Sequence, residues 1–133
     1  MKQTVYLAGG FKSNWAERVK KCSENFNWVN PKEKEYKNGE RVVMNVNEYG
    51  KWDLHYIKKS DIVFVYIEKE NTSCIGLCVE AGFAKGLGKT VILVIEPNHE
   101  TIKDVYLSFV TQVSDITFDN LEDGVNYLKS FSI

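Results

Sequence analysis

The chain has 133 residues, a length that suits one compact domain and excludes a second one of ordinary size. Hydrophobic residues make up 44% and charged residues 26%, which are globular values and exclude a disordered tail or a coiled-coil rod. The 17 Lys and Arg and 18 Asp and Glu residues leave a net charge of −1, so we expect neither nucleic acid nor a membrane as partner.

The cysteines and the amino-terminal residues indicate a reducing, cytoplasmic location. Three cysteines are an odd number, and the chain enters an apolar strand without the hydrophobic segment of a secretory signal. Cys74 and Cys78 lie four residues apart, but no further ligands follow at metal-binding spacing. We therefore expect no zinc site.

The first half of the chain predicts a strand, a helix, a strand and a polar excursion. Apolar residues 5–8 predict a strand, and Gly9 and Gly10 then predict a loop where the backbone can approach a ligand. The alternative is a glycine turn without a ligand. Three- and four-residue spacing predicts a helix over about 14–25, with Ser13 as N-cap, and residues 26–29 can form a second strand. We expect the polar residues 30–45 to form a surface excursion.

The second half of the chain predicts a βαβ unit followed by shorter elements. Spacing predicts a helix over 47–59, and the β-branched and aromatic run 62–67 is typical of a central parallel strand. A helix over about 76–87, ended by Gly88, and a buried strand over 90–95 complete the unit. Residues 102–109 can form a short helix, residues 113–118 a last strand, and a terminal helix follows with Leu121, Val125 and Leu128 on its core face.

This alternation predicts an α/β fold, a doubly wound parallel sheet of about five strands in the order 2-1-3-4-5 with helices on both faces. Ligands bind such sheets beyond the carboxyl ends of the strands, where the strand order reverses. We therefore expect a crevice between residues 8–11 and residues 66–70. No dinucleotide fingerprint or P-loop follows the first strand, which excludes both of those phosphate-binding motifs.

Two carboxylates are candidates for chemistry. Glu80 stands among small and apolar residues in the predicted helix 76–87, where the positive end of the helix dipole would stabilise its ionised form, as a nucleophile requires. Asp53, between Trp52 and Leu54, can be half-buried with a raised pKa. The alternative for each is a place on the solvent-facing side of its helix. Asp61 precedes a strand at the opposite sheet edge, so we assign it to a cap or turn.

Several short motifs together resemble the nucleoside 2-deoxyribosyltransferase family. They are Tyr6 to Phe11, Trp52 to Leu54 with Ile57 and Ser60 to Ile62, and Gly76 with Glu80 to Ala84 and Gly88-Lys89, in the family's order and spacing over roughly residues 4–95. The resemblance implies one flavodoxin-like domain over residues 1–133 and transfer of 2-deoxyribose between bases through a covalent glycosyl-enzyme, with no cofactor. Relatives in that family hydrolyse nucleoside 5′-monophosphates.

Position by position, the resemblance implies roles for the site residues. Glu80 would be the nucleophile on the anomeric carbon, Asp53 the acid that contacts and protonates the leaving base, and Tyr6 the hydroxyl that orients Glu80. The substrate-binding candidates are Ala8, Gly9, Gly10, Phe11, Ser73, Cys74, Gly76 and Ser114. Phe11 can alternatively belong to the core.

The sequence departs from the family pattern in two places. Family transferases carry an aspartate six residues before the nucleophile, and nucleotide hydrolases often carry a serine, whereas this chain has Cys74 with Ser73 beside it. The transferases also receive an asparagine from a neighbouring subunit, where this chain has Ile116. The 5′ group and the acceptor therefore do not follow from the resemblance.

Three hypotheses remain for the function, each with a nucleoside or nucleotide as small-molecule ligand. We prefer transfer of deoxyribose by a homo-oligomer whose site borrows residues from about 108–115. The second hypothesis is a nucleotide N-hydrolase in which Ser73 and Ser114 hold the phosphate. The third is a non-catalytic nucleotide-sensing module, against which the presence of Tyr6, Asp53 and Glu80 argues.

Overall fold

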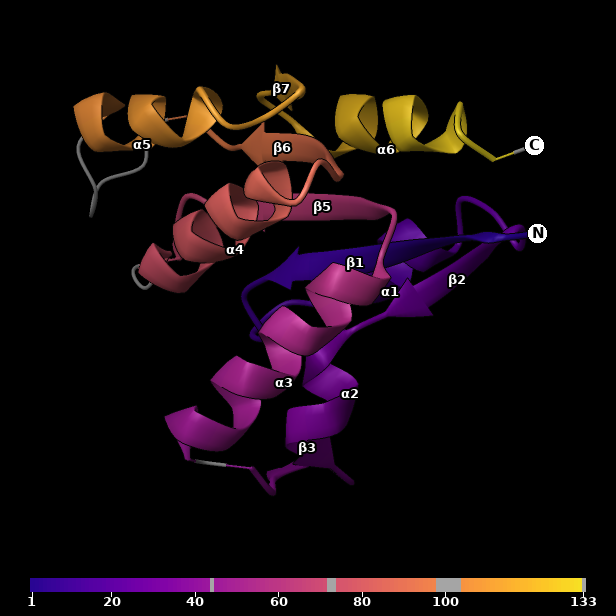
Figure 1. Cartoon of the computed structure of the whole chain (residues 1–133), viewed down its shortest axis with the longest axis vertical. Coiled ribbons are helices and arrows are strands. Elements are labelled where there is room, and N and C mark those ends of the chain that lie inside the picture. Colours follow the sequence, from indigo (N-terminus) through magenta and orange to yellow (C-terminus); the bar gives the residue numbers. More distant parts are fainter. Residues whose placement is uncertain (44, 72–73, 98–103, 133) are drawn as a thin grey trace.

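The computed structural model describes residues 1–43, 45–71, 74–97 and 104–132, and backbone only for 104–106. Five parallel strands form its main sheet: β1 (Gln3–Gly9), β2 (Phe26–Val29), β5 (Ile62–Ile67), β6 (Thr90–Ile95) and β7 (Ile116–Phe118). Their order is β2-β1-β5-β6-β7 (Figure 1). Counted within this sheet alone, the order is 2-1-3-4-5, which confirms the predicted fold.

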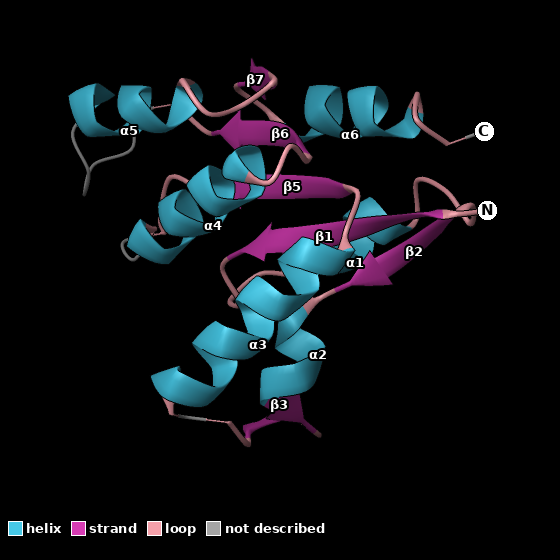
Figure 2. Cartoon of the chain, in the orientation of Figure 1, coloured by secondary structure: helices cyan, strands magenta, loops and turns pink. Residues whose placement is uncertain are grey.

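Helices cover both faces of the sheet (Figure 2). On one face lie α3 (Val46–Lys59), α4 (Ile75–Gly86) and α5 (Asp104–Thr111), whose buried residues share a core with Tyr6 and Ala8 of β1. On the other face lie α1 (Trp15–Lys20) and α6 (Leu121–Lys129), which share a core with Val5 and Leu7. Successive β1 side chains thus alternate between the two cores, as the pleat of a strand requires.

The central strand of the sheet, β5, pairs with β1, which carries Tyr6. All six residues of β5 are buried, because the strand is covered by helices on both faces. Tyr6 of β1 pairs with Val63 of β5 on one side and with Val29 of β2 on the other. Tyr6 therefore lies on a strand that is paired on both sides.

The largest differences from the predicted boundaries lie at the first helix and at the last strand. Asn14, not Ser13, is the N-cap of α1, because the Ser13 hydroxyl donates to Glu68 Oε1 at 3.1 Å. The helix ends at Lys20, and the chain then turns, with the Cys22 N–H donating to the Val19 carbonyl at 3.0 Å. The last strand begins at Ile116, because residues 113 and 114 still bond back to α5. Residues 102 and 103 of the predicted short helix lie outside the described residues.

Residues 31–41, within the predicted surface excursion, form a short helix and a hairpin. Asn30 caps α2 (Pro31–Glu35), with its Oδ1 accepting from the Lys32 N–H at 3.2 Å and proline at the first helical position. A hairpin follows, made of β3 (Tyr36–Lys37) and β4 (Glu40–Arg41). Its turn residues Asn38 (φ 53°) and Gly39 (φ 81°) are both left-handed, as a tight two-residue turn requires.

Among the described residues, no helix combines the length and apolar character that crossing a bilayer demands.

Candidate active site

Three polar side chains from three elements meet on one face of the sheet. Tyr6 comes from β1, Asp53 from the second half of α3 and Glu80 from the second turn of α4. The two helices pack against each other, and both pack against β1. Tyr6 is fully buried, whereas Asp53 and Glu80 are half-buried. The structure therefore brings together all three residues that the resemblance assigned to catalysis.

One polar atom on each of these three side chains is buried without a hydrogen-bond partner among the described residues. Within the described part of the chain, the Tyr6 hydroxyl, Asp53 Oδ1 and Glu80 Oε2 are buried and make no hydrogen bond of good geometry. The hydroxyl is nevertheless near enough to both carboxyl groups to affect their pKa values. Buried polar atoms are almost always paired in folded proteins. Three unpaired ones in one place indicate a site that a ligand completes.

Burial controls the protonation of this cluster. Burial raises the pKa of Asp53 to about 7, the charge of Glu35 adds to the rise, and the Tyr6 hydroxyl opposes it. Burial also raises the pKa of Glu80 to about 8, which the Tyr6 hydroxyl opposes and the charges of Asp53 and Glu35 increase. Burial and both carboxyl groups raise the Tyr6 pKa, so its phenol stays a proton donor. At neutral pH, the two carboxyl groups together therefore retain at least one proton.

The raised pKa expected for Asp53 is confirmed, but the expectation for Glu80 is wrong. The helix dipole acts mainly within the first turn, and Glu80 is the sixth residue of α4, which begins at Ile75. Its dominant influence is burial, which favours the neutral acid. An ionised Glu80 therefore depends on the Tyr6 hydroxyl and on the ligand, not on the helix terminus.

The structure adds a fourth acid that the sequence analysis missed. Glu35, at the end of α2, is only 3% exposed and forms an ion pair with Arg41, with Oε1 3.0 Å from Nη2. We expected these charges on the surface. The available signal was the four-residue spacing from Pro31, which places both residues on one face of a helix that Asn30-Pro31 begins.

The packing of Trp15 explains why a glycine stands at position 9, at the end of β1. A Cβ atom on Gly9 would overlap the Trp15 indole, and the Trp15 Nε1–H donates to the Gly10 carbonyl at 2.8 Å. This packing supports the glycine-turn alternative for the Gly9-Gly10 pair. Phe11 belongs to neither buried core, and its half-buried ring meets the ring of Tyr36 edge-on at 5.8 Å. The core alternative for Phe11 is therefore wrong.

The remaining substrate-binding candidates are scattered. Ala8 is buried in the same core as Tyr6, Cys74 is fully buried directly before α4, and Gly76 is exposed with open space beside it. Ser73 lies outside the described residues. Ser114 lies before β7, at the amino edge of the sheet, where its hydroxyl donates to the Thr111 carbonyl at 2.9 Å. Within one chain, the structure does not bring Ser114 to the cluster.

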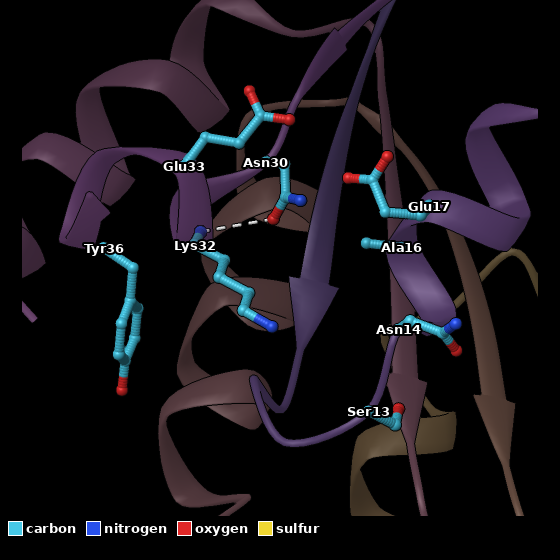
Figure 3. Close-up of a pocket in the computed structure, with 8 residues that line it drawn as sticks. All are labelled: Ser13, Asn14, Ala16, Glu17, Asn30, Lys32, Glu33 and Tyr36. Carbon is cyan, nitrogen blue, oxygen red and sulfur yellow. Dashed lines mark hydrogen bonds between the residues drawn. The ribbon is translucent and has the colours of Figure 1, made fainter. Parts of the chain in front are cut away.

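A cavity of about 250 Å³ lies between α1 and α2 (Figure 3). Its lining consists of Ser13, Asn14, Ala16, Glu17, Asn30, Lys32, Glu33 and Tyr36. None of the three cluster residues lines it, so we place the site by its unpaired acids rather than by this cavity. In the described ranges, no three His, Cys, Asp or Glu side chains are arranged to hold a metal ion.

Residues 2–98 match the family described as nucleoside 2-deoxyribosyltransferase like, which is well over half of the chain. The chain belongs to this family. No curated protein matches it.

Three solved structures share its fold. A conserved protein from Enterococcus faecalis is 14% identical with a TM-score of 0.75, covering 98% of this chain and 99% of its own. A 2-deoxyribosyltransferase from Bacillus psychrosaccharolyticus is 27% identical with a TM-score of 0.66, covering 93% and 91%. The CMP N-glycosidase BcmB of Clostridium botulinum is 19% identical with a TM-score of 0.59, covering 97% and 99%. At their low identities, the first and third show a common fold alone.

Proposed function

We propose that the protein transfers 2-deoxyribose between nucleobases, with Glu80 as nucleophile and Asp53 as acid. The observation that carries the proposal is the group of three buried, unpaired polar atoms on Tyr6, Asp53 and Glu80. Family membership and the similarity to a 2-deoxyribosyltransferase support the choice of a nucleoside as substrate.

In the first half of the reaction, a Glu80 carboxylate oxygen bonds to C1′ of the sugar while the bond from C1′ to the base nitrogen breaks. The electron pair of that bond leaves with the base, which takes a proton from Asp53. The products are a glycosyl ester of Glu80, a free base and an ionised Asp53. Tyr6 supports this step, because its nearby hydroxyl lowers the pKa of Glu80 and so favours the ionised form.

In the second half, a nitrogen of the acceptor base attacks C1′, and the Glu80 oxygen leaves with the electron pair of the ester bond. The ionised Asp53 takes up the proton that the acceptor loses, which restores the starting state. If water attacks instead, the same ester is hydrolysed. Transfer and hydrolysis therefore differ only in the group that reaches C1′.

Hydrolysis of a nucleoside 5′-monophosphate is the second candidate. It stays open because the CMP N-glycosidase shares the fold and because Cys74 stands where the resemblance expects an aspartate in a transferase. A purely ligand-sensing module is the third candidate, and it has no need of two neighbouring acids with raised pKa values.

A panel of 2′-deoxynucleosides and their 5′-monophosphates, incubated with and without an acceptor base, distinguishes these candidates by chromatography. Base exchange that requires the acceptor supports the transferase. Release of base without an acceptor, greater for the monophosphates, supports the hydrolase. Inactivity on the whole panel, at protein concentrations that saturate binding, supports the sensing module. The Glu80→Gln variant serves as the background control in each incubation.

A further inference from the structure

The cavity of about 250 Å³ between α1 and α2 has no part in the proposed reaction. It lies at the carboxyl ends of β1 and β2, because its lining includes Ser13 from the segment after β1 and Asn30, which directly follows β2. Ligands of doubly wound sheets bind at this edge. Pockets for drug-sized ligands measure about 300–1,000 Å³, so this cavity suits a ligand smaller than a whole nucleotide.

Asn30 brings an unused hydrogen-bond donor to the cavity. The residue is only 7% exposed, and its Oδ1 accepts from the Lys32 N–H at 3.2 Å, which caps α2 (Figure 3). Among the described residues, the Nδ2 of Asn30 donates to no acceptor. Buried polar groups in folded proteins are almost always hydrogen-bonded. The Nδ2 group is therefore free to donate to a ligand in the cavity.

The charges around the cavity cancel. Lys20 Nζ lies 2.8 Å from Glu33 Oε1 and 3.8 Å from Glu17 Oε1, so one ammonium group faces both acids. Lys32 forms no ion pair with the described side chains, and its ammonium group lies at the end of the cavity away from the two carboxyl groups (Figure 3). Two lysines and two glutamates leave no net charge, which favours a neutral ligand over an anion such as phosphate.

Tyr36 places an aromatic ring in the wall of the cavity. Its ring meets the ring of Phe11 edge-on, with the two ring centres 5.8 Å apart, and this contact fixes its orientation. Aromatic side chains stack on the flat faces of nucleobases of every kind. A neutral, planar heterocycle with hydrogen-bond acceptors therefore matches the volume of the cavity, its balanced charge, its free amide donor and its aromatic wall.

We propose that this cavity binds a free nucleobase, at a second site distinct from the cluster of Tyr6, Asp53 and Glu80. The choice of a nucleobase among neutral heterocycles rests on the proposed function, in which one free base leaves and another enters. The Asn30 Nδ2 and the Lys32 ammonium group donate to acceptors on the edge of the base, as Asn and Lys side chains do when they read bases in a nucleic acid.

Hypoxanthine is the probe, because it is neutral and carries, like guanine, the neighbouring acceptors O6 and N7. Nuclear magnetic resonance of ¹⁵N-labelled protein follows the side-chain amide of Asn30, whose signal is missing in Asn30→Asp. We expect hypoxanthine to shift this signal to saturation. Asn30→Asp keeps the oxygen that caps α2 but loses the donor, so the affinity should fall at least about tenfold. Asn45→Asp is the matched control, because Asn45 caps α3 in the same way, outside the cavity, and its affinity should equal that of the wild type.

Lys32→Met is a second variant, because it removes the ammonium group and keeps the backbone N–H that Asn30 accepts from. Its affinity for hypoxanthine should also fall about tenfold. Hypoxanthine that shifts no signal of the cavity residues, or that binds both folded variants as tightly as the wild type, overturns the inference. Tighter binding of inorganic phosphate than of hypoxanthine overturns it as well.

Base exchange, measured separately, distinguishes this inference from the proposed function. A wild type that exchanges bases but binds no hypoxanthine in the cavity refutes the inference alone. An inactive wild type whose Asn30 signal responds to hypoxanthine refutes the proposed function alone.

Discussion

The indole Nε1–H of Trp15 donates to the backbone carbonyl of Gly10 at 2.8 Å, and the indole ring occupies the space where a side chain on Gly9 would lie. Trp15 belongs to the core under α1 and α6, whereas Tyr6 points into the core under α3 and α4. The loop that begins at the carboxyl end of β1 is thus fixed from the face of the sheet opposite the acids. The tryptophan supports the site without entering it.

Gly9→Ala should therefore destabilise the fold. The added methyl group overlaps the buried indole, and forced overpacking of this kind costs about 1–3 kcal/mol. Urea unfolding measures the change in the free energy of unfolding. Gly82→Ala is the control, because a Cβ there meets nothing within 4 Å, and alanine in a helix interior is favoured over glycine by about 1 kcal/mol. Equal stabilities for the two variants would contradict the packing role of Gly9.

Glu80→Gln should lower turnover by several orders of magnitude without unfolding the protein. The amide keeps the size of the side chain but is a poor nucleophile toward C1′. Initial rates of base release measure the loss, and mass spectrometry with a slow 2-fluoro nucleoside should locate a sugar adduct on Glu80 of the wild type. The control is Glu122→Gln, because Glu122 is exposed at the start of α6. Activity of Glu80→Gln within tenfold of the wild type would exclude Glu80 as nucleophile.

Asp53→Asn should slow the reaction most for bases that leave poorly and least for activated ones, because a general acid matters in proportion to the leaving group's need for a proton. In the wild type, the reaction needs a protonated Asp53 and an ionised Glu80, whose pKa values are about 7 and about 8, so activity should be greatest between these values and decrease at higher and lower pH. Rates for a series of leaving groups, each measured across pH, test both expectations. A uniform loss across the series would indicate that Asp53 only positions the base.

The same two acids should make the protein less stable as pH rises. Asp53 and Glu80 have pKa values of about 7 and about 8 in the folded chain, above their ordinary values of 3.8 and 4.5. Between these limits the folded state binds more protons than the unfolded state, so the free energy of unfolding falls with increasing pH. The double variant Asp53→Asn, Glu80→Gln should therefore exceed the wild type by at least about 1 kcal/mol at pH 8 and show no such gain at pH 4. If the free energy of unfolding decreases equally with pH in the wild type and the double variant, groups other than Asp53 and Glu80 cause the decrease.

We also expect a homo-oligomer that uses the exposed part of α5. Leu107 and Val110 belong to the chain's own core, but Phe109 remains 79% exposed. Ile75 and Val79 add exposed apolar surface on α4, which packs against α5. Phe109→Lys should weaken association, measured by sedimentation at micromolar concentration. A wild type that is fully active as a monomer would contradict the expectation.

The sequence pattern predicted the elements whose burial depends mainly on their own residues. The run 62–67 could only be a buried strand, and periodicity placed Asp53 on a helix beside bulky residues, where burial raises its pKa. The burial of Glu35 depends on a hairpin partner, Arg41, and on a helix of only five residues, so the four-residue spacing from Pro31 could not predict it by itself. Ser13 does not cap the helix, because its hydroxyl donates to Glu68, which is 55 positions away in the sequence.

The elements that carry Tyr6, Glu80 and Glu35 differ in their resistance to local opening. Tyr6 stands on a strand paired on both sides, and Glu80 stands on a helix of 12 residues, but Glu35 depends on a helix of five residues and two strands of two residues each. Small elements with few buried contacts open far more often than a central sheet. Amide hydrogen exchange should accordingly be faster in residues 31–41 than in β1 or β5. Each such opening exposes Glu35 and Arg41 to water while Tyr6 and Glu80 keep their places, so residues 31–41 can repack without disturbing the central sheet.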